Sequence, residues 1–257
     1  MNSIQFNLAR VVGPALGGIA LSKLGAAWCF SLNGLSFIAV IISLLMIKPK
    51  FVPQGSSESV LHSMLEGINF LRSREGMINL VAFAFLLTLL SYPIITFLPV
   101  MATTVFHGGP NTLSLFLSLS GLGSIAGALI IAGTQARPGQ AKRSLFVMLL
   151  LGCVMFGFGL SKVLAVSTAL VFGAGACLMV VFTLNTSLVQ FYVDDKMRGR
   201  VMSVYSVAFR GGMPMGSLLS GFLSKTMSAP AIMATNGVLV VLAGLYFLLV
   251  QRKVAKL

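Results

Sequence analysis

Charged residues are scarce in this chain, and acidic residues most of all. Only 5 of the 257 residues are Asp or Glu, and all charged residues together make up 9%, whereas a soluble domain carries about 25%. Hydrophobic residues make up 57%, and the mean hydropathy is +0.98. A soluble protein of this composition would expose large apolar patches and aggregate. The shortage of charge therefore argues against a soluble domain and favours a protein embedded in a lipid bilayer.

Cysteine and histidine are also few, which limits metal and redox chemistry. Cys29, Cys153 and Cys177 are isolated within apolar segments and form no C-x-x-C pair, so neither a zinc site nor a disulfide framework is indicated. The sequence has no H-E-x-x-H motif, and no acid lies in an apolar block. We therefore predict no enzymatic activity, no metal and no cofactor.

The net charge of +13 raises the alternative of a nucleic-acid-binding protein. The basic residues, however, lie in short clusters between apolar blocks and form no stripe along one face. The chain also lacks an RNA- or DNA-binding motif. We therefore expect a lipid bilayer, and no nucleic acid, as the partner of this chain.

Most of the sequence consists of long apolar blocks. A helix needs about 20 apolar residues to cross the hydrocarbon core of a bilayer. We predict an all-α membrane protein with about eight transmembrane helices, at roughly 3–22, 26–47, 77–102, 112–133, 144–161, 164–189, 201–223 and 230–250.

The longest polar connection, residues 48–76, predicts a linker between two bundles. It opens with Lys48-Pro49-Lys50 and continues through a Pro-, Gly- and Ser-rich stretch. From Val60 to Leu71 apolar residues then recur at helical spacing, between charged residues. This pattern predicts an amphipathic helix on the membrane surface.

The distribution of basic residues predicts the orientation of the chain. Eight alternating helices place 13 of the 18 Lys and Arg residues on one side and 3 on the other, with Arg10 and Arg210 inside helices. Basic residues accumulate on the cytoplasmic side of membrane proteins. We therefore expect the 48–76 linker and the C-terminus to be cytoplasmic, and the protein to lie in the plasma membrane (the bacterial inner membrane).

The first and seventh predicted helices resemble each other at an offset of 200 residues. Ser3, Arg10 and Pro14 match Ser203, Arg210 and Pro214. Transporters are commonly built from such repeats, and this repeat implies a unit of six helices. We expect residues 1–47 to be the last two helices of an N-terminal half, residues 48–76 the linker, and residues 77–257 a complete C-terminal half. By this interpretation four helices precede Met1 in the intact protein; the alternative is an eight-helix protein with two similar hairpins.

Two sequence motifs resemble those of the major facilitator superfamily. Arg10-Val-Val-Gly13-Pro14-Ala-Leu-Gly17-Gly18 resembles the G-P-x-x-G-G motif of drug and metabolite antiporters. The stretch from Asn2 to Phe37, and the loop from Asp195 to Tyr205, are similar to the branch of enterobactin and macrolide exporters, the transmembrane secretion effectors. The resemblance covers essentially the whole chain, as helices five to twelve.

The resemblance implies roles for both motifs. The helix of the first motif would pack between the two halves and control leakage; Pro14 should kink it, and Gly13 and Gly17 allow close approach of another helix. An ordinary tight helix crossing is the alternative. The resemblance implies that the gate loop, which we define as Asp194, Asp195, Arg198, Gly199 and Arg200, locks the cytoplasmic face. The usual partner of this loop lies in the first half, so a solvated loop remains the alternative.

Two intramembrane charges and three polar groups complete the candidate site. Arg10 and Arg210 lie roughly 15 Å into their helices, at 1.5 Å per residue, where a charge needs a partner or water. The partner of each Arg could be helix carbonyls, water, an anionic substrate or a carboxylate elsewhere. The alternative is that each side chain snorkels to the cytoplasmic surface and needs no such partner. Tyr92, Asn185 and Gln190 are candidate pocket residues.

These features together predict secondary active transport. We expect efflux of a small amphipathic or anionic metabolite, siderophore or drug by alternating access. Protons are the expected coupling ion in the intact protein, although no carboxylate lies in a span of this chain. The competing hypothesis is a non-transporting membrane scaffold or assembly partner derived from a transporter fragment.

Overall fold

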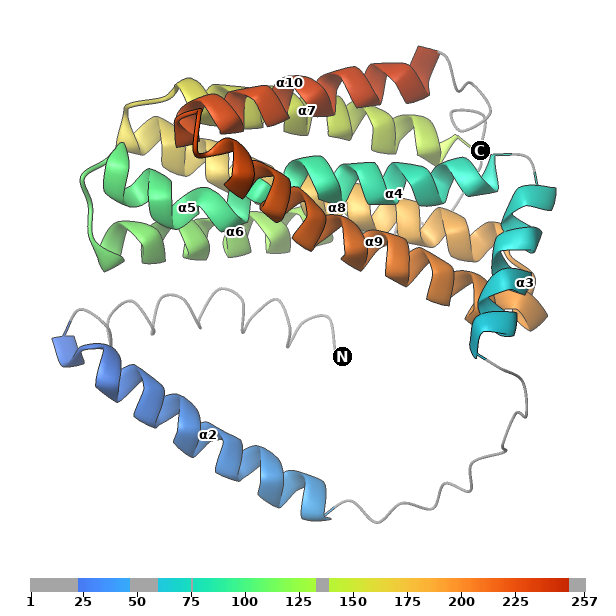
Figure 1. Ribbon diagram of the computed structural model, residues 1–257, viewed down its shortest axis with the longest axis horizontal. Coiled ribbons are helices and arrows are strands. Elements are labelled where there is room, and N and C mark those ends of the chain that lie inside the picture. Colours follow the sequence, from blue (N-terminus) through green and yellow to red (C-terminus); the bar gives the residue numbers. More distant parts are fainter. Residues whose placement is uncertain (1–22, 47–59, 75, 133–138, 250–257) are drawn as a thin grey trace.

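The computed structural model describes residues 23–46, 60–74, 76–132 and 139–249, and within these ranges all regular structure is α-helical. The helices are α2 (Ala26–Met46), α3 (Val60–Ser73), α4 (Met77–Ser91), α5 (Pro93–Thr104), α6 (Pro110–Ile131), α7 (Gln140–Leu160), α8 (Leu164–Tyr192), α9 (Asp195–Leu223) and α10 (Ala229–Leu249). Helices α4 to α10 form one bundle, and α3 crosses one end of it (Figure 1). An all-α membrane protein is therefore confirmed.

Six segments of the described residues are long and apolar enough to cross a membrane. They are α2, the α4–α5 pair (Met77–Thr104), α6, α7, α8 and α10. Each coincides with a predicted apolar block to within a few residues. The first predicted block, 3–22, lies outside the described residues, and with it Arg10, Gly13, Pro14, Gly17 and Gly18.

Helix α9 fills the seventh predicted block but is much less apolar than the others. It runs for 29 residues, which is about 43 Å at 1.5 Å per residue and enough to span a bilayer. It begins at Asp195, six residues before the predicted start. The acidic Asp195 in the first turn favours the positive end of the helix dipole. A count of apolar residues cannot detect that charged first turn, nor the early start of α7 at Gln140.

The third predicted block is broken into two helices. Tyr92 ends α4, and Pro93 occupies the first position of α5, where proline's missing N–H is tolerated. Proline cannot donate the backbone hydrogen bond that would continue α4. The span therefore consists of two helical segments that meet at Tyr92.

Glycines bring the bundle helices together in pairs. A Cβ on Gly123 or Gly127 of α6 would overlap the backbone of Phe172 or Ala176 of α8. The same holds for Gly152 and Gly159 of α7 against α10, and for Gly216 of α9 against Leu89 of α4. Small residues allow backbones to approach closely where lipid provides no hydrophobic driving force. These crossings fix the pairs α6–α8, α7–α10 and α4–α9.

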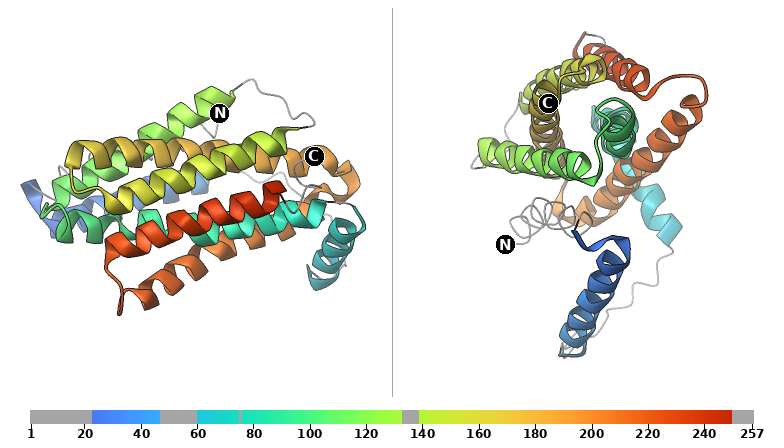
Figure 2. Two further views of the ribbon diagram at one scale, coloured as in Figure 1. Left: turned by 90° about the horizontal axis from the view of Figure 1, so that it is seen from above. Right: turned by 90° about the vertical axis from the view of Figure 1, so that its left-hand side faces the viewer.

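Phenylalanine rings fill the centre between the helix pairs. Phe116 of α6 meets Phe158 of α7 edge-on, with ring centroids 5.9 Å apart. Phe83 of α4 meets Phe247 of α10 in the same manner, at 5.5 Å. Such edge-to-face pairs add about 0.5–1.5 kcal/mol beyond the burial of area. Helix α4 lies at the centre of the bundle seen from its end (Figure 2).

Helix α2 lies apart from the bundle (Figures 1 and 2). Trp28 is 58% exposed and Phe30 is 77% exposed. The sequence analysis assigns α2 to a different half of the protein from α4 to α10. Its separation from the bundle is compatible with that division, which stays a prediction.

The amphipathic helix predicted in the linker is present as α3. Its apolar residues are divided between two environments: Leu71 is fully buried in the fold, whereas Leu61 and Leu65 are 73% and 58% exposed. The end of α3 that carries Leu71 packs against α9 and α4. Part of the face expected to lie on a membrane surface therefore belongs to the protein core.

Candidate functional site

Charged residues from α3 and α9 meet at one end of the bundle. Glu66 of α3 forms an ion pair with Arg200 of α9, and both side chains are only about one third exposed (34% and 32%). Arg74, which follows α3, lies 3.2 Å from Asp194, which precedes α9. Arg198 pairs with Asp195 one turn away on α9 at 2.6 Å. The charged residues of the gate loop are therefore all paired, two of them with the linker.

Close packing supports the Glu66–Arg200 pair. A Cβ on Gly67 would lie 2.9 Å from the carbonyl oxygen of Arg200 and 3.1 Å from a methyl group of Val204. One turn later Leu71 is fully buried. The backbone of α3 therefore touches that of α9 next to the ion pair. Gly199, in contrast, has open space where a side chain would be. We call the contact formed by Glu66, Gly67, Leu71, Arg74, Asp194 and Arg200 the α3–α9 clasp.

A polar cluster lies inside the bundle, about 7.5 Å along α9 from Arg200 of the clasp. The Nδ2 group of Asn185 on α8 donates to the carbonyl oxygen of Leu80 on α4 (3.3 Å) and to the hydroxyl of Tyr205 on α9 (3.4 Å). The same Tyr205 hydroxyl lies 3.0 Å from the hydroxyl of Thr186. Asn185 and Tyr205 are 1% and 2% exposed. The cluster therefore joins three helices through hydrogen bonds that hydrocarbon cannot replace.

The three candidate pocket residues do not come together. Asn185 is buried against Leu80, and Gln190 is exposed near the end of α8. Tyr92, 36% exposed, lies at the α4–α5 junction, twelve residues along the chain from Leu80, which is about 18 Å along a helix. These residues therefore occupy three separate places in the described bundle.

Arg210 lies close to the middle of α9. It follows Arg200 of the clasp by ten residues, which is about 15 Å along the helix, or half of a hydrocarbon core about 30 Å thick. Its side chain is exposed, and no ion pair or hydrogen bond joins it to another described residue. A charge at that depth costs at least about 2.5–3.5 kcal/mol when it faces lipid. Arg210 therefore needs water or a partner from outside the described bundle.

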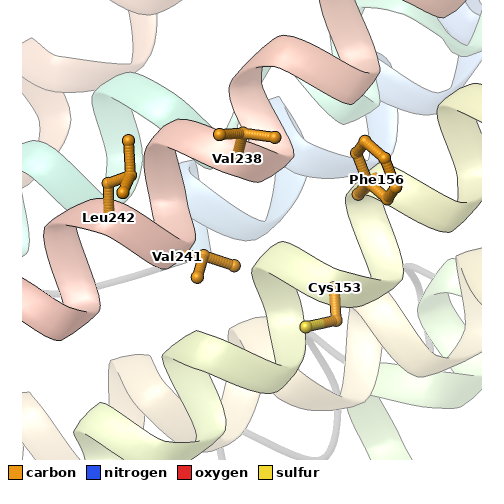
Figure 3. Close-up of a pocket in the computed structure, with 5 residues that line it drawn as sticks. All are labelled: Cys153, Phe156, Val238, Val241 and Leu242. Carbon is orange, nitrogen blue, oxygen red and sulfur yellow. The ribbon is translucent and has the colours of Figure 1, made fainter.

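An open hollow of the surface lies elsewhere, between α7 and α10. It encloses about 240 Å³ and is lined by Cys153, Phe156, Val238, Val241 and Leu242 (Figure 3). Phe156, Val238 and Leu242 are each at least 40% exposed. The lining has no charged or amide group to orient a polar molecule, so this hollow suits lipid tails better than a polar substrate.

Sequence reasoning did not single out Thr186, Glu66 or Arg74, and it quoted Tyr205 only as the end of a motif. Glu66 carried a usable signal, because it is the one acid in the amphipathic stretch. Its pairing with Arg200 joins residues 134 positions apart and depends on the packing of Gly67.

No cluster of His, Cys, Asp or Glu able to hold a metal occurs among the described residues.

Comparison with known proteins places this bundle in a family. Residues 1–256 match the profile of the family described as transmembrane secretion effector. The staphyloferrin A transporter of Staphylococcus aureus is 24% identical over 98% of this chain and 63% of its own length. The enterobactin exporter of Citrobacter koseri is 26% identical over 96% of this chain and 59% of its own length. The chain thus spans about three fifths of the length of these curated relatives.

Proposed function

This chain belongs to the transmembrane secretion effector family of the major facilitator superfamily, and we propose that it acts in the secondary active export of a small anionic, metal-chelating metabolite of the siderophore class. The observation that carries the proposal is the family match over residues 1–256, on a chain whose described part is a bundle of membrane-length helices. The names of two relatives, a staphyloferrin A transporter and an enterobactin exporter, support the substrate class.

The proposed division of the chain follows the six-helix repeat. Residues 77–257 form the C-terminal half, residues 48–76 the linker, and residues 1–47 the last two helices of the N-terminal half. The compact α4–α10 bundle and the separate α2 support this division. Residues 10–18 would then pack between the halves. Alternating access follows from the rocking of one bundle against the other.

The α3–α9 clasp is our candidate for the cytoplasmic gate. The excess of basic residues at this end of the bundle supports a cytoplasmic position for it. Glu66 and Arg74 couple the linker to the start of α9, so that a movement of the linker is passed to α9. Asp194, Asp195, Arg198 and Arg200 would hold this end closed while the opposite face is open. Gly199, which has no neighbour within 4 Å of a Cβ, leaves room for such a movement.

Transport is tested in inside-out membrane vesicles with a radiolabelled siderophore and an imposed pH gradient. Two proteins are compared: the 257-residue chain, and the chain extended by any open reading frame that precedes it. Gradient-driven uptake that a protonophore abolishes would support proton-coupled export. The absence of flux from both proteins, with normal amounts in the membrane, would refute the proposal and favour a non-transporting scaffold.

A further inference from the structure

The exposed side of α9 that bears Arg210 is rich in polar groups, with Val207 as an exposed apolar residue among them. Ser203, Ser206 and Arg210 are all exposed, and they recur at spacings of three and four residues, which places them on one face of the helix. The opposite face carries Gly212 and Gly216, which pack against α4, and Val204, which packs against Gly67 of α3. Lipid tails cannot satisfy a guanidinium group, so this face borders water or a polar partner.

Acidic side chains of the described residues are all engaged far from Arg210. Glu66, Asp194 and Asp195 pair with Arg200, Arg74 and Arg198 at the end of the bundle, about 15 Å or more along α9 from Arg210. No acidic side chain of the described residues therefore compensates the positive charge at the middle of α9, and an anion is its natural complement.

Aromatic rings lie on the adjoining side of α9, which faces α8. Phe209, next to Arg210 in the chain, has its ring centroid 4.6 Å from that of Phe182 on α8 and 6.1 Å from that of Tyr205. Phe182 and Phe209 are only half-buried, so part of each ring is open to a ligand. Thr186, whose hydroxyl meets that of Tyr205, belongs to the same region. A molecule with an anionic group and an apolar ring could pair with a guanidinium and contact such half-buried rings on the adjoining side of the helix.

We propose that Arg210 is the anion-binding residue of the substrate passage and that its guanidinium pairs with a carboxylate of the substrate, while Phe182 and Phe209 contact the apolar part of the same molecule. The planar guanidinium fork matches a carboxylate with two parallel hydrogen bonds. This inference rests on the proposed export function, and it gives that function a substrate class: amphipathic carboxylates. Arg210 binds the substrate in this proposal and does not transfer a proton during transport.

Binding to the full chain in lipid nanodiscs tests the site. Equilibrium dialysis compares 2-naphthoate with its neutral isostere 2-naphthamide. We expect the wild-type chain to prefer naphthoate, Arg210→Gln to bind it at least about tenfold more weakly, and Arg210→Lys to bind it with intermediate affinity. Lys225→Gln is the matched control, because Lys225 lies beyond the end of α9, with its ammonium 5.1 Å from the ring of Phe222; it should bind like wild type.

Two results would overturn the inference. One is equal binding of naphthoate and naphthamide by the wild-type chain. The other is a well-folded Arg210→Gln protein, with an unchanged melting temperature, that binds naphthoate like wild type. If Arg210 pairs instead with a carboxylate of another protein segment, Arg210→Gln lowers the melting temperature and the wild-type chain shows no naphthoate preference; that outcome also refutes the anion site.

Vesicle flux separates this inference from the proposed function. Siderophore transport that is equal in wild type and Arg210→Gln would leave the export function standing and reject the role of Arg210. Arg210-dependent naphthoate binding without any siderophore flux would support the anion site and reject the export function. Loss of both flux and naphthoate binding in Arg210→Gln, with both retained in Lys225→Gln, supports both.

Discussion

Glu66 of the linker helix α3 forms an ion pair with Arg200 in the second turn of α9. Two residues 134 positions apart in the chain thus fix the linker to a membrane helix. Gly67 beside Glu66 allows the two backbones to touch. Because each side chain is about two thirds buried, this pair is shielded from solvent better than the neighbouring Arg74–Asp194 pair, whose side chains are 55% and 66% exposed.

Glu66→Gln should loosen α3 from the bundle. We expect amide hydrogen exchange within residues 60–73 to rise by roughly two- to fivefold, which corresponds to about 0.5–1 kcal/mol for a partly exposed ion pair. The charge exchange Glu66→Arg with Arg200→Glu should restore part of the protection. Arg198→Gln is the control, because the partner of Arg198 lies on α9 itself. Unchanged exchange in Glu66→Gln would show that packing alone holds α3.

Gly216→Ala should destabilise the α4–α9 pair. The added Cβ would overlap the backbone of Leu89, and overpacking of this kind costs about 1–3 kcal/mol. Gly221→Ala is the matched control on the same helix, because a Cβ at Gly221 meets nothing within 4 Å. That substitution should be neutral or slightly stabilising, since alanine favours helix over glycine by up to about 1 kcal/mol. Thermal unfolding in detergent measures both, and equal melting temperatures would contradict the close crossing.

Tyr205→Phe should weaken the polar cluster that joins α4, α8 and α9. The substitution removes the hydroxyl that meets Asn185 and Thr186. We expect a loss of about 0.5–1 kcal/mol, the usual range for a hydrogen bond between membrane helices. A double-mutant cycle with Thr186→Val isolates the coupling of the two hydroxyls. Strictly additive effects of the two substitutions would show that this hydrogen bond contributes nothing to stability.

Cysteine labelling checks the orientation. In a cysteine-free background, Lys142→Cys near the start of α7 and Lys162→Cys between α7 and α8 place exposed thiols at opposite ends of one helix. Given cytoplasmic basic clusters, a membrane-impermeant maleimide added to intact cells should label Cys at position 162 and leave that at 142 unlabelled until the cells are permeabilised. The reverse pattern would invert the proposed topology.

The sequence predicted the membrane helices well because lipid burial needs long apolar runs, and those are visible in composition alone. The predicted helix bounds were wrong where charged residues or a proline, and not apolar runs, determine where a helix begins or ends. The first turn of α9 from Asp195 is charged, and Tyr92 and Pro93 break a uniformly apolar block. Arg210 was identifiable from the sequence as a charge inside an apolar block, and the gate loop as a cluster of charges between two such blocks. The partners of the gate loop, Glu66 and Arg74, were not, because pairing between distant segments depends on where backbones cross, and that follows from glycines whose neighbours only the fold reveals.

The crossing of Leu89 with Gly216 also sets an order of events in biosynthesis. Helix α4 enters the membrane while its partner α9 is still 127 residues of synthesis away. At 5–20 residues per second, translation takes about 6–25 s to close that gap. Throughout this interval the backbone surface of α4 that later receives Gly216 must be covered by lipid, by earlier helices or by the insertion machinery. The rate of translation therefore sets when the bundle can be completed, and a chain interrupted before α9 leaves the central helix α4 without its closely packed partner.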